Sequence, residues 1–447
     1  MLKFYIKTYG CQMNERDSES LACLLESKGY VQSRDEEDAD ILIFNTCSVR
    51  DQAERKVIGK VGIMKRLKQQ RPQLILGIIG CMAQRLGGRL LEQLPHLDFV
   101  AGTDQLQNIP SILSELLSKR GVRVAATENG PGVFSELDGH RPGRLISEIS
   151  VMRGCDQFCT YCIVPYCRGR EKSRPIAAIV DEAARLAAGG TREILLLGQN
   201  ITAYGVAEAR RDGTYTPEFS AFADLLAALN EVKGIERIRF TSPHVKFMND
   251  KFIDAVTSLP KVCKCFHIPV QSGSDRILQK MNRNYTAAEY LSRIDAIRAK
   301  APQALFSTDI IVGFCSETRA EFEMTRQLMR QVGYDMAYIF RYSQREGTRA
   351  AATMPDDVPE AEKHERNQLL LEELNTSVAR HNQTMLGSVV QVLVEGPSPR
   401  NGQRWCGRSD LNKMVLFPPS PQLHPGDIRD FVISRTTGNA LYGELKP

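Results

Sequence analysis

The run Arg153-Gly154-Cys155-Asp156-Gln157-Phe158-Cys159-Thr160-Tyr161-Cys162 places three cysteines close together, at the spacing C-x3-C-x2-C. Three thiolates at such a spacing hold three irons of a [4Fe–4S] cube and leave the fourth iron without a protein ligand. The apolar stretch Ile146–Met152 leads directly into the run. The sequence therefore predicts a strand that ends in an iron–sulfur loop.

The open iron of such a cube is a site for a small molecule. This cysteine spacing is typical of enzymes in which S-adenosylmethionine (SAM) binds there and an electron splits its sulfonium to give a 5′-deoxyadenosyl radical. The alternative is a zinc knot, because zinc prefers four ligands in a closed site and Cys167 stands near enough to be the fourth. The basic turn Arg168-Gly169-Arg170 suits a substrate phosphate as well as a structural site. We interpret Cys167 as a free thiol.

Strand and helix patterns alternate over about residues 145–375. The expected strands are Ile146–Met152, Glu193–Leu197, Arg237–Thr241, Cys265–Val270, Ser307–Gly313 and Met336–Tyr342, separated by helical patterns such as Ile176–Gly189 and Ala287–Lys300. Six βα units predict a parallel, partly open (β/α)6 barrel with its active site at the C-terminal ends of the strands. The cysteine run follows the first strand and is therefore expected on that face.

Polar clusters follow three other strands of this predicted barrel. They are Gly198-Gln199-Asn200, Gln271-Ser272-Gly273-Ser274 and Gly313-Phe314-Cys315-Ser316-Glu317. Because all of them are expected on the active face, we predict Gln199, Asn200, Gln271 and Ser272 as SAM contacts. The alternative is plain turn chemistry, since Gly, Asn and Ser favour loops.

The first 125 residues also alternate strands with helices. The strands are expected at Leu2–Tyr9, Asp40–Asn45 and Leu74–Gly80, and the helices at Ser18–Lys28 and Gln52–Gln70. This order predicts a doubly wound α/β domain with a parallel sheet over residues 1–125.

Each of these three strands runs into a cysteine, namely Cys11, Cys47 or Cys81. The C-terminal ends of parallel strands lie along one edge of a sheet, where ligands bind. The three thiols, scattered in sequence, are therefore expected to converge in space. The alternative for each is a small buried hydrophobe.

The remainder of the chain is expected to form a linker, a helix and a small barrel. Residues 127–144 are rich in Gly, Pro and polar residues, and residues 356–382 form a charged helical bridge. Over residues 383–447, short strands separated by turns predict an OB-like β-barrel, a fold that often binds nucleic acid. Its basic residues include Arg400, Arg404, Arg408, Lys413, Arg429 and Arg435.

Composition sets the broad class. A length of 447 residues suggests about three domains, 42% hydrophobic residues support filled cores, and a net charge of +5 permits an anionic partner. The apolar runs are too short to cross a bilayer. The N-terminus is expected to be a strand and not a signal peptide, so we expect a cytoplasmic protein without a membrane partner.

The chain resembles the methylthiotransferase family along nearly its whole length. The matching runs are Tyr9-Gly10-Cys11-Gln12-Met13-Asn14, Asn45-Thr46-Cys47-Ser48-Val49-Arg50, Gly80-Cys81-Met82-Ala83-Gln84-Arg85, the cysteine run through Cys162, Arg168-Gly169-Arg170-Glu171, Leu197-Gly198-Gln199-Asn200, Pro269-Val270-Gln271-Ser272-Gly273-Ser274 and Arg345-Glu346-Gly347-Thr348. The last 65 residues resemble the family's TRAM domain, an RNA-binding barrel. The Cys47-Ser48-Val49-Arg50 run is most similar to the branch that modifies dimethylallyladenosine in tRNA.

The resemblance implies two [4Fe–4S] clusters and two uses of SAM. Cys155, Cys159 and Cys162 would hold the cluster that cleaves SAM, while an auxiliary cluster on Cys11, Cys47 and Cys81 would carry or donate sulfur. One SAM would methylate that sulfur, and a second would yield the radical that removes hydrogen from carbon 2 of the adenine.

The resemblance also implies the partners of the enzyme. They are a tRNA anticodon stem-loop, an electron donor such as flavodoxin and a supplier of sulfur or clusters, and the protein is expected to be a monomer. The alternatives are methylthiolation of threonylcarbamoyl-adenosine in tRNA or of a ribosomal-protein aspartate, and a non-enzymatic RNA-binding protein with structural metal sites.

Two positions depart from the family pattern. The family usually has Gly-Phe-Pro-Gly-Glu-Thr where this chain has Gly313-Phe314-Cys315-Ser316-Glu317-Thr318. It usually has Thr at the position of Cys167. Neither position is a predicted cluster ligand, but the first puts a thiol near the expected SAM site.

Overall fold

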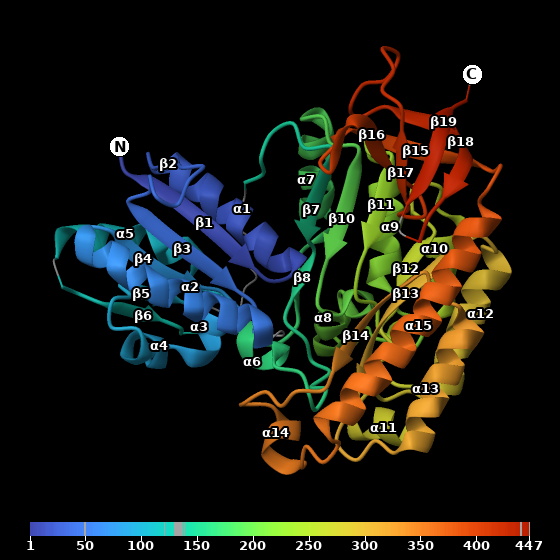
Figure 1. Cartoon of the computed structure of the whole chain (residues 1–447), viewed down its shortest axis with the longest axis horizontal. Helices are drawn as coiled ribbons and strands as arrows, with labels where there is room; N and C mark the ends of the chain where they lie inside the picture. Colours follow the sequence, from blue (N-terminus) through green and yellow to red (C-terminus); the bar gives the residue numbers. More distant parts are fainter. Residues whose placement is uncertain (49–50, 120, 129–136, 138, 439, 447) are drawn as a thin grey trace.

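The computed structural model describes residues 1–48, 51–119, 121–128, 137, 139–438 and 440–446. Figure 1 shows three parts in chain order: an α/β sheet in blue, a curved α/β body from green to orange, and a small β-barrel in red. Val49 and Arg50 of the predicted branch-specific run lie outside the described residues, as do residues 129–136 and 138 of the predicted linker.

The N-terminal part is a six-stranded parallel sheet in the order β2-β1-β3-β4-β5-β6. Its strands are β1 (Lys3–Tyr9), β2 (Val31–Gln32), β3 (Ile41–Thr46), β4 (Ile75–Ile79), β5 (Phe99–Ala101) and β6 (Val124–Ala126). Its helices are α1 (Gln12–Ser27), α2 (Asp51–Gln70), α3 (Cys81–Leu86), α4 (Gly88–Gln93), η1 (Leu106–Asn108) and α5 (Ile109–Ser118).

Helices cover both faces of this sheet, which makes it doubly wound as predicted. Leu21 of α1 and Leu113 of α5 pack in the core on one face, and Val61 of α2 and Leu90 of α4 pack in the core on the other. The sequence missed β2, β5 and β6, because a strand of two or three residues is too short to show a period in its apolar positions.

The start predicted for α1 is wrong. The helix begins at Gln12 and not at Ser18, so it follows Cys11 directly. The polar run before Ser18 does not look like the first turns of an amphipathic helix, yet Asn14, Arg16 and Asp17 are buried. They are buried because this end of α1 packs against the middle part of the chain and not against solvent.

The middle part contains the six predicted parallel strands in two sheets, β7-β10-β11 and β12-β13-β14. They are β7 (Ile146–Ser150), β10 (Glu193–Leu197), β11 (Arg237–Phe240), β12 (Cys265–His267), β13 (Leu305–Val312) and β14 (Met336–Arg341). A parallel bridge between Ile238 and Val262 links the sheets. Among the described strands, β7 and β14 do not pair, so the structure is a partial barrel.

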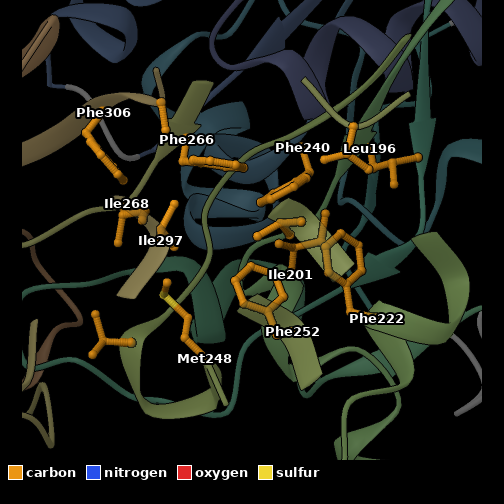
Figure 2. Close-up of a cluster of buried hydrophobic side chains, with 14 of the residues drawn as sticks. Leu196, Ile201, Phe222, Phe240, Met248, Phe252, Phe266, Ile268, Ile297 and Phe306 are labelled. Carbon is orange, nitrogen blue, oxygen red and sulfur yellow. The ribbon is translucent and has the colours of Figure 1, made fainter. Parts of the chain in front are cut away.

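The helices of this part surround the barrel. The longer ones are α7 (Ile176–Ala188), α9 (Ala221–Asn230), α10 (Asp250–Ser258), α12 (Ala287–Lys300), α13 (Arg319–Val332) and α15 (Glu360–Thr384). The short elements are β8 (Met152–Arg153), α6 (Val164–Arg168), β9 (Lys172–Ser173), η2 (Ile201–Ala203), α8 (Val206–Arg211), η3 (Val245–Phe247), α11 (Asp275–Lys280) and α14 (Arg349–Thr353). Figure 2 shows the core between strands and helices, where Phe240 of β11 meets Phe222 of α9 and Phe252 of α10.

The C-terminal part is a closed five-stranded barrel in the order β15-β16-β17-β19-β18. Its strands are β15 (Val389–Ser398), β16 (Asn401–Ser409), β17 (Met414–Phe417), β18 (Ile428–Thr436) and β19 (Leu441–Leu445). Arg237 and Arg239, on β11, donate hydrogen bonds of 2.7 Å to the carbonyls of Arg408 and Ser409. The small barrel therefore docks at the N-terminal end of β11, opposite the end expected to carry the active site.

Among the described helices, none combines the length and the hydropathy that a membrane crossing requires.

Candidate active site

A cavity of about 1210 Å³ lies at the C-terminal ends of the barrel strands, beside the N-terminal sheet. Cys155, Cys159 and Cys162 line it, and so does Cys11 from the start of α1. Residues more than 140 positions apart in the sequence therefore face one space. They meet because both parts place the C-terminal ends of their parallel strands toward each other.

The cysteine loop between β8 and α6 is held by hydrogen bonds from its surroundings. The amide of Thr160 donates to the carbonyl of Met281 at 3.0 Å, and the side chain of Asn282 donates to the carbonyls of Gln157 and Phe158. Gly154 precedes the loop at a φ of +79°, and a Cβ there would lie 2.1 Å from the carbonyl oxygen of Arg170. Only glycine fits this close approach.

Burial strongly disfavours free thiolates in this loop. Removal from water raises the pKa of Cys162 to about 12 and also raises the pKa of Cys155. A metal centre offsets this cost, because its positive charge stabilises the thiolate form that binds it. The donor set, with Cys159 buried and Cys155 and Cys162 half-buried, therefore fits an iron–sulfur cluster.

The structure also brings Cys11, Cys47 and Cys81 together, as the strand pattern predicted. Cys47 follows β3, Cys81 begins α3, and a hydrogen bond with Cys47 lowers the pKa of Cys11 to about 6. Burial raises the pKa of Cys81. A Cβ on Gly10 would lie 3.0 Å from the Cβ of Cys47, so the backbone just before Cys11 lies close to Cys47.

A buried polar network supports this second group of cysteines. The side chain of Asn14 donates to Asn45 Oδ1 at 2.9 Å, and Asn45 donates back to the carbonyl of Asn14. Asp17 accepts hydrogen bonds from Arg153 at 2.7 Å and from Arg168 at 2.9 Å. Because both arginines belong to the barrel part, Asp17 ties the helix after Cys11 to the loop that carries the other cysteines.

Cys167 lies between the two groups of cysteines. It packs against Cys81 and Ile163 where α6 meets α3, and its carbonyl accepts a hydrogen bond from Thr103. The interpretation of Cys167 as a free thiol stays a prediction. Within the described part of the chain, no three His, Cys, Asp or Glu side chains lie close enough to hold a single metal ion.

Three of the four predicted SAM contacts line the cavity, namely Gln199, Asn200 and Gln271. The side-chain oxygen of Gln199 is buried and, within the described structure, accepts no hydrogen bond. An acceptor in this position fits a donor such as the amino group of SAM. Ser272 is instead buried against Thr325, at 3.4 Å between the hydroxyl groups, and its role stays a prediction.

Sequence reasoning missed other residues of the cavity wall. They include His244, Arg283, Asp309, Tyr338 and Phe340. The alternation of side chains along β14 could have indicated two of them. Tyr338 and Phe340 lie two residues apart, so their side chains lie on the same face of the strand. No comparable pattern marks Arg283, whose guanidinium lies 3.5 Å from Cys159 Sγ.

The departure at Cys315 lies outside this wall. Cys315 is buried in a small cluster with Phe314 and Tyr342. Ser316 adopts a φ of +64°, a left-handed conformation that glycine adopts at no steric cost. Its carbonyl accepts from Arg276 at 2.7 Å, which holds the turn without the usual Pro-Gly pair.

Three family models match the chain: "Uncharacterized protein family UPF0004" over residues 3–102, "Radical SAM superfamily" over 149–329 and "TRAM domain" over 383–446. A radical S-adenosylmethionine methyltransferase, TsrM, from Kitasatospora setae has a similar fold, with a TM-score of 0.53 at 13% identity. That alignment covers 76% of this chain and 72% of TsrM. The fold and the site together define a radical SAM enzyme.

Two relatives named tRNA-2-methylthio-N(6)-dimethylallyladenosine synthase match almost end to end. The protein of Opitutus terrae is 45% identical, over 100% of this chain and 98% of its own length. The protein of Akkermansia muciniphila is 42% identical, over 99% and 98%. The chain belongs to this family of tRNA methylthiotransferases, which confirms the predicted family and fold class.

Proposed function

We propose that this chain is a radical SAM tRNA methylthiotransferase that converts N(6)-isopentenyl-adenosine beside the anticodon to its 2-methylthio derivative. The observation that carries the proposal is the shared cavity, which Cys11 lines together with Cys155, Cys159 and Cys162. A reaction that breaks a C–H bond and then adds sulfur needs a radical source and a sulfur source close to one substrate atom.

Cys155, Cys159 and Cys162 would hold the cluster that binds SAM, and Cys11, Cys47 and Cys81 would hold the auxiliary cluster. When bound, these groups supply a 5′-deoxyadenosyl radical and a sulfur atom for transfer. The protein provides the positions. The guanidinium of Arg283 lies 3.5 Å from the sulfur of Cys159. Arg153 and Arg168 bond to Asp17 and thereby hold α1, and with it Cys11, against the barrel.

The cavity wall suits an apolar substituent on the base. Ile311, Tyr338 and Phe340 contribute to the wall, and the rings of Tyr338 and Phe340 stack at 6.4 Å with 16° between their planes. A base in an anticodon loop is already single-stranded, which lowers the cost of moving it into a buried site. Burial of the five prenyl carbons would contribute roughly 2–4 kcal/mol.

The C-terminal barrel presents a basic, aromatic surface suited to RNA. The guanidinium groups of Arg404 and Arg435 lie over the ring of Tyr442, at 5.1 and 3.8 Å from its centre. Such groups bind phosphates and stack on bases. Lys413 is not part of this surface, because it is buried in an ion pair with Asp335.

The remaining partners belong to the same proposal. Reductive cleavage of SAM requires an electron donor such as flavodoxin, and repeated turnover requires a supplier of sulfur or clusters. We also propose that the enzyme acts as a monomer in the cytoplasm, where its tRNA substrate is found.

The test is product analysis after anaerobic reconstitution. The protein is incubated with SAM, dithionite and matched tRNAs with or without the prenyl group, and the nucleosides are analysed by mass spectrometry. We expect a 2-methylthio product at least about 30-fold faster from the prenylated tRNA, since 2 kcal/mol corresponds to that ratio. Equal rates would move the assignment to a sister substrate, and absence of reductive SAM cleavage would overturn the enzyme class.

A further inference from the structure

The loop that follows β14 lies between the two groups of cysteines. Arg345 lines the cavity, and Glu346, Gly347 and Thr348 lead from it into α14. We call residues 345–350 the bridging loop. Its contacts run to the cysteine loop of the barrel on one side and to the N-terminal sheet on the other.

On the first side, the bridging loop is fixed to the cysteine loop. The amide of Ala350 donates to the carbonyl of Thr160 at 2.8 Å, inside the run of three cysteines. Gly347 has a φ of +92°, and a Cβ there would lie 3.4 Å from Cδ1 of Ile163, which follows Cys162. These contacts set the place of the bridging loop relative to the cysteines of the barrel.

The bridging loop is also braced from within. Thr348 donates to the carbonyl of Arg345 through its amide at 3.0 Å and through its hydroxyl at 2.8 Å. The same hydroxyl accepts from the amide of Ala351 at 3.3 Å and so caps α14. The backbone that carries Glu346 is therefore held in one conformation.

On the other side, Glu346 reaches two arginines of the N-terminal part. Its Oε1 lies 3.0 Å from Nη1 of Arg89, and its Oε2 lies 3.6 Å from Nη1 of Arg85. Arg85 belongs to α3, the helix that begins at Cys81. The two ion pairs therefore join the bridging loop to one of the cysteine-bearing elements of the sheet.

Arg85 extends this connection to the chain after Cys47. It donates to Glu54 at 2.7 Å, and Glu54 accepts at 2.6 Å from the hydroxyl of Ser48, the residue next to Cys47. Ser48 is fully buried, and the side chains of Glu54 and Arg85 are only 10% and 14% exposed. Charged hydrogen bonds are stronger in such a place than at the surface, so the network is firm.

The cysteine edge of the N-terminal sheet is thus held to the barrel at both ends. At the β1 end, Asp17 pairs with Arg153 and Arg168. At the β4 end, Arg85 pairs with Glu346. Strand β3 lies between β1 and β4. A single junction would let the sheet pivot about it, whereas two junctions fix its orientation.

We propose that Glu346 and Arg85 are positioning residues: through the bridging loop they set where the cysteines of the N-terminal sheet stand relative to a base in the cavity. This rests on the proposed function. A misplacement of about 1 Å can cost about 100-fold in a step between two held groups. Each C–H bond broken gives one 5′-deoxyadenosine whether or not sulfur is then transferred, so the yield of product per 5′-deoxyadenosine reports this positioning.

The experiment reverses one charge and then exchanges the pair, in the reconstituted full-length enzyme. The variants are Glu346→Arg alone and Glu346→Arg combined with Arg89→Glu. Glu365→Arg is the matched control, because Glu365 pairs with Arg319 at 2.8 Å within the barrel part, and its side chain is 57% exposed against 68% for Glu346.

Two quantities are measured. The first is the amount of 2-methylthio product per 5′-deoxyadenosine, with dithionite and saturating SAM and prenylated tRNA. The second needs no turnover: it is the rate of amide hydrogen exchange, by mass spectrometry, in peptides that cover α3 and the bridging loop.

We expect Glu346→Arg, which faces two arginines, to lower the product per 5′-deoxyadenosine by about fivefold or more and to speed amide exchange in both peptides. The rate of 5′-deoxyadenosine formation and the iron content should stay within about twofold of the wild type. The exchanged pair should recover at least half of the lost yield, since Arg85 keeps Glu54 as its partner. Glu365→Arg should change neither quantity.

Four outcomes would overturn the proposal: an unchanged yield in Glu346→Arg, a loss that the exchanged pair does not recover, an equal loss in Glu365→Arg, or a parallel loss of iron. Failure of the proposed function would look different, because the wild type itself would then form no 2-methylthio product, while amide exchange would still report the contact.

Discussion

At the scale of single residues, the junction beside Cys11 depends on buried charge. Asp17 is 1% exposed and is paired with Arg153 and Arg168, which are themselves 13% and 3% exposed. These arginines hold the pKa of Asp17 below its usual value against the effect of burial. The pairing matters because a lone charge in such a place is far more costly than a satisfied pair.

We therefore expect Asp17→Asn to lower the free energy of unfolding by about 3 kcal/mol, since it removes the buried carboxylate that pairs with Arg153 and Arg168. Urea unfolding followed by circular dichroism measures the change. Asp224→Asn is the matched control, because Asp224 forms an exposed pair with Lys251 and should cost less than about 0.5 kcal/mol. Similar losses in both variants would contradict the argument.

Glu321 gives a pH-dependent contribution at the start of α13. A hydrogen bond from Arg276 lowers its pKa from 4.5 to about 2. Since the folded pKa lies below the unfolded one, the stabilisation is present above pH 4.5 and is lost as the pH falls toward 2. Arg276 is 45% exposed, so we expect Glu321→Gln to cost only about 1 kcal/mol at pH 7.

The difference between wild type and Glu321→Gln should shrink between pH 5 and pH 2 in urea unfolding experiments. Glu323→Gln, on the same helix and 43% exposed, is the control and should show little difference at either pH. A constant difference for Glu321→Gln across this range would argue against the ion pair as its cause.

At the scale of elements, the ends of parallel strands decide where the thiols lie. Cys47 comes directly after β3, and Cys11 and Cys81 each follow β1 and β4 after a single glycine, so three adjacent strands deliver one cysteine each to the same edge. The loop after β8 delivers the other group to the facing edge of the barrel. Two separate groups of three thiols therefore predict two separate clusters.

Iron counting tests this arrangement. The reconstituted wild type should hold about eight irons per chain, and the variant with Cys11, Cys47 and Cys81 all changed to Ala should hold about four while still cleaving SAM with dithionite. Cys167→Ala is the matched control, because its thiol is buried beside Cys81 and should leave the iron content unchanged. A triple variant without iron, or a wild type that never exceeds four, would refute two clusters.

At the scale of the whole molecule, the C-terminal barrel and the cavity lie at opposite ends of the large barrel. Arg237, Arg239 and Asp335, near the N-terminal ends of β11 and β14, all bond to the C-terminal barrel. Deletion of residues 383–447 would remove these hydrogen bonds and the ion pair and expose the docking face, so charge reversal on the surface of the C-terminal barrel is a sharper test of RNA binding than truncation.

Changing Arg404 and Arg435 together to Glu should weaken tRNA binding by about tenfold or more and reduce the slope of log Kd against log salt by roughly two. Fluorescence anisotropy at several salt concentrations measures both quantities. Reductive cleavage of SAM without tRNA should not change, because the two arginines lie outside the described cavity wall. An unaltered salt dependence would remove this surface from the tRNA interface.

Most elements of this protein follow local patterns in its sequence. Strand β10 lies where its apolar run predicts, and α12 begins and ends at the predicted residues. The beginning of α1 was not predictable in this way, since its polar residues are buried against distant parts of the chain, Asp17 for example against Arg153 and Arg168. Local periodicity reports burial within one element, and it carries no information about a distant partner.

The sequence by itself determined the three successive folds, the two groups of cysteines and the edge of each sheet on which they stand, because strand order and the position after a strand are local properties. Only the tertiary structure decided that Cys11 lines the same cavity as Cys155, Cys159 and Cys162, that Cys167 lies between the two groups, and that Lys413 is buried in an ion pair rather than exposed to RNA. These outcomes depend on how separate parts pack, and packing is set by contacts between residues far apart in the chain.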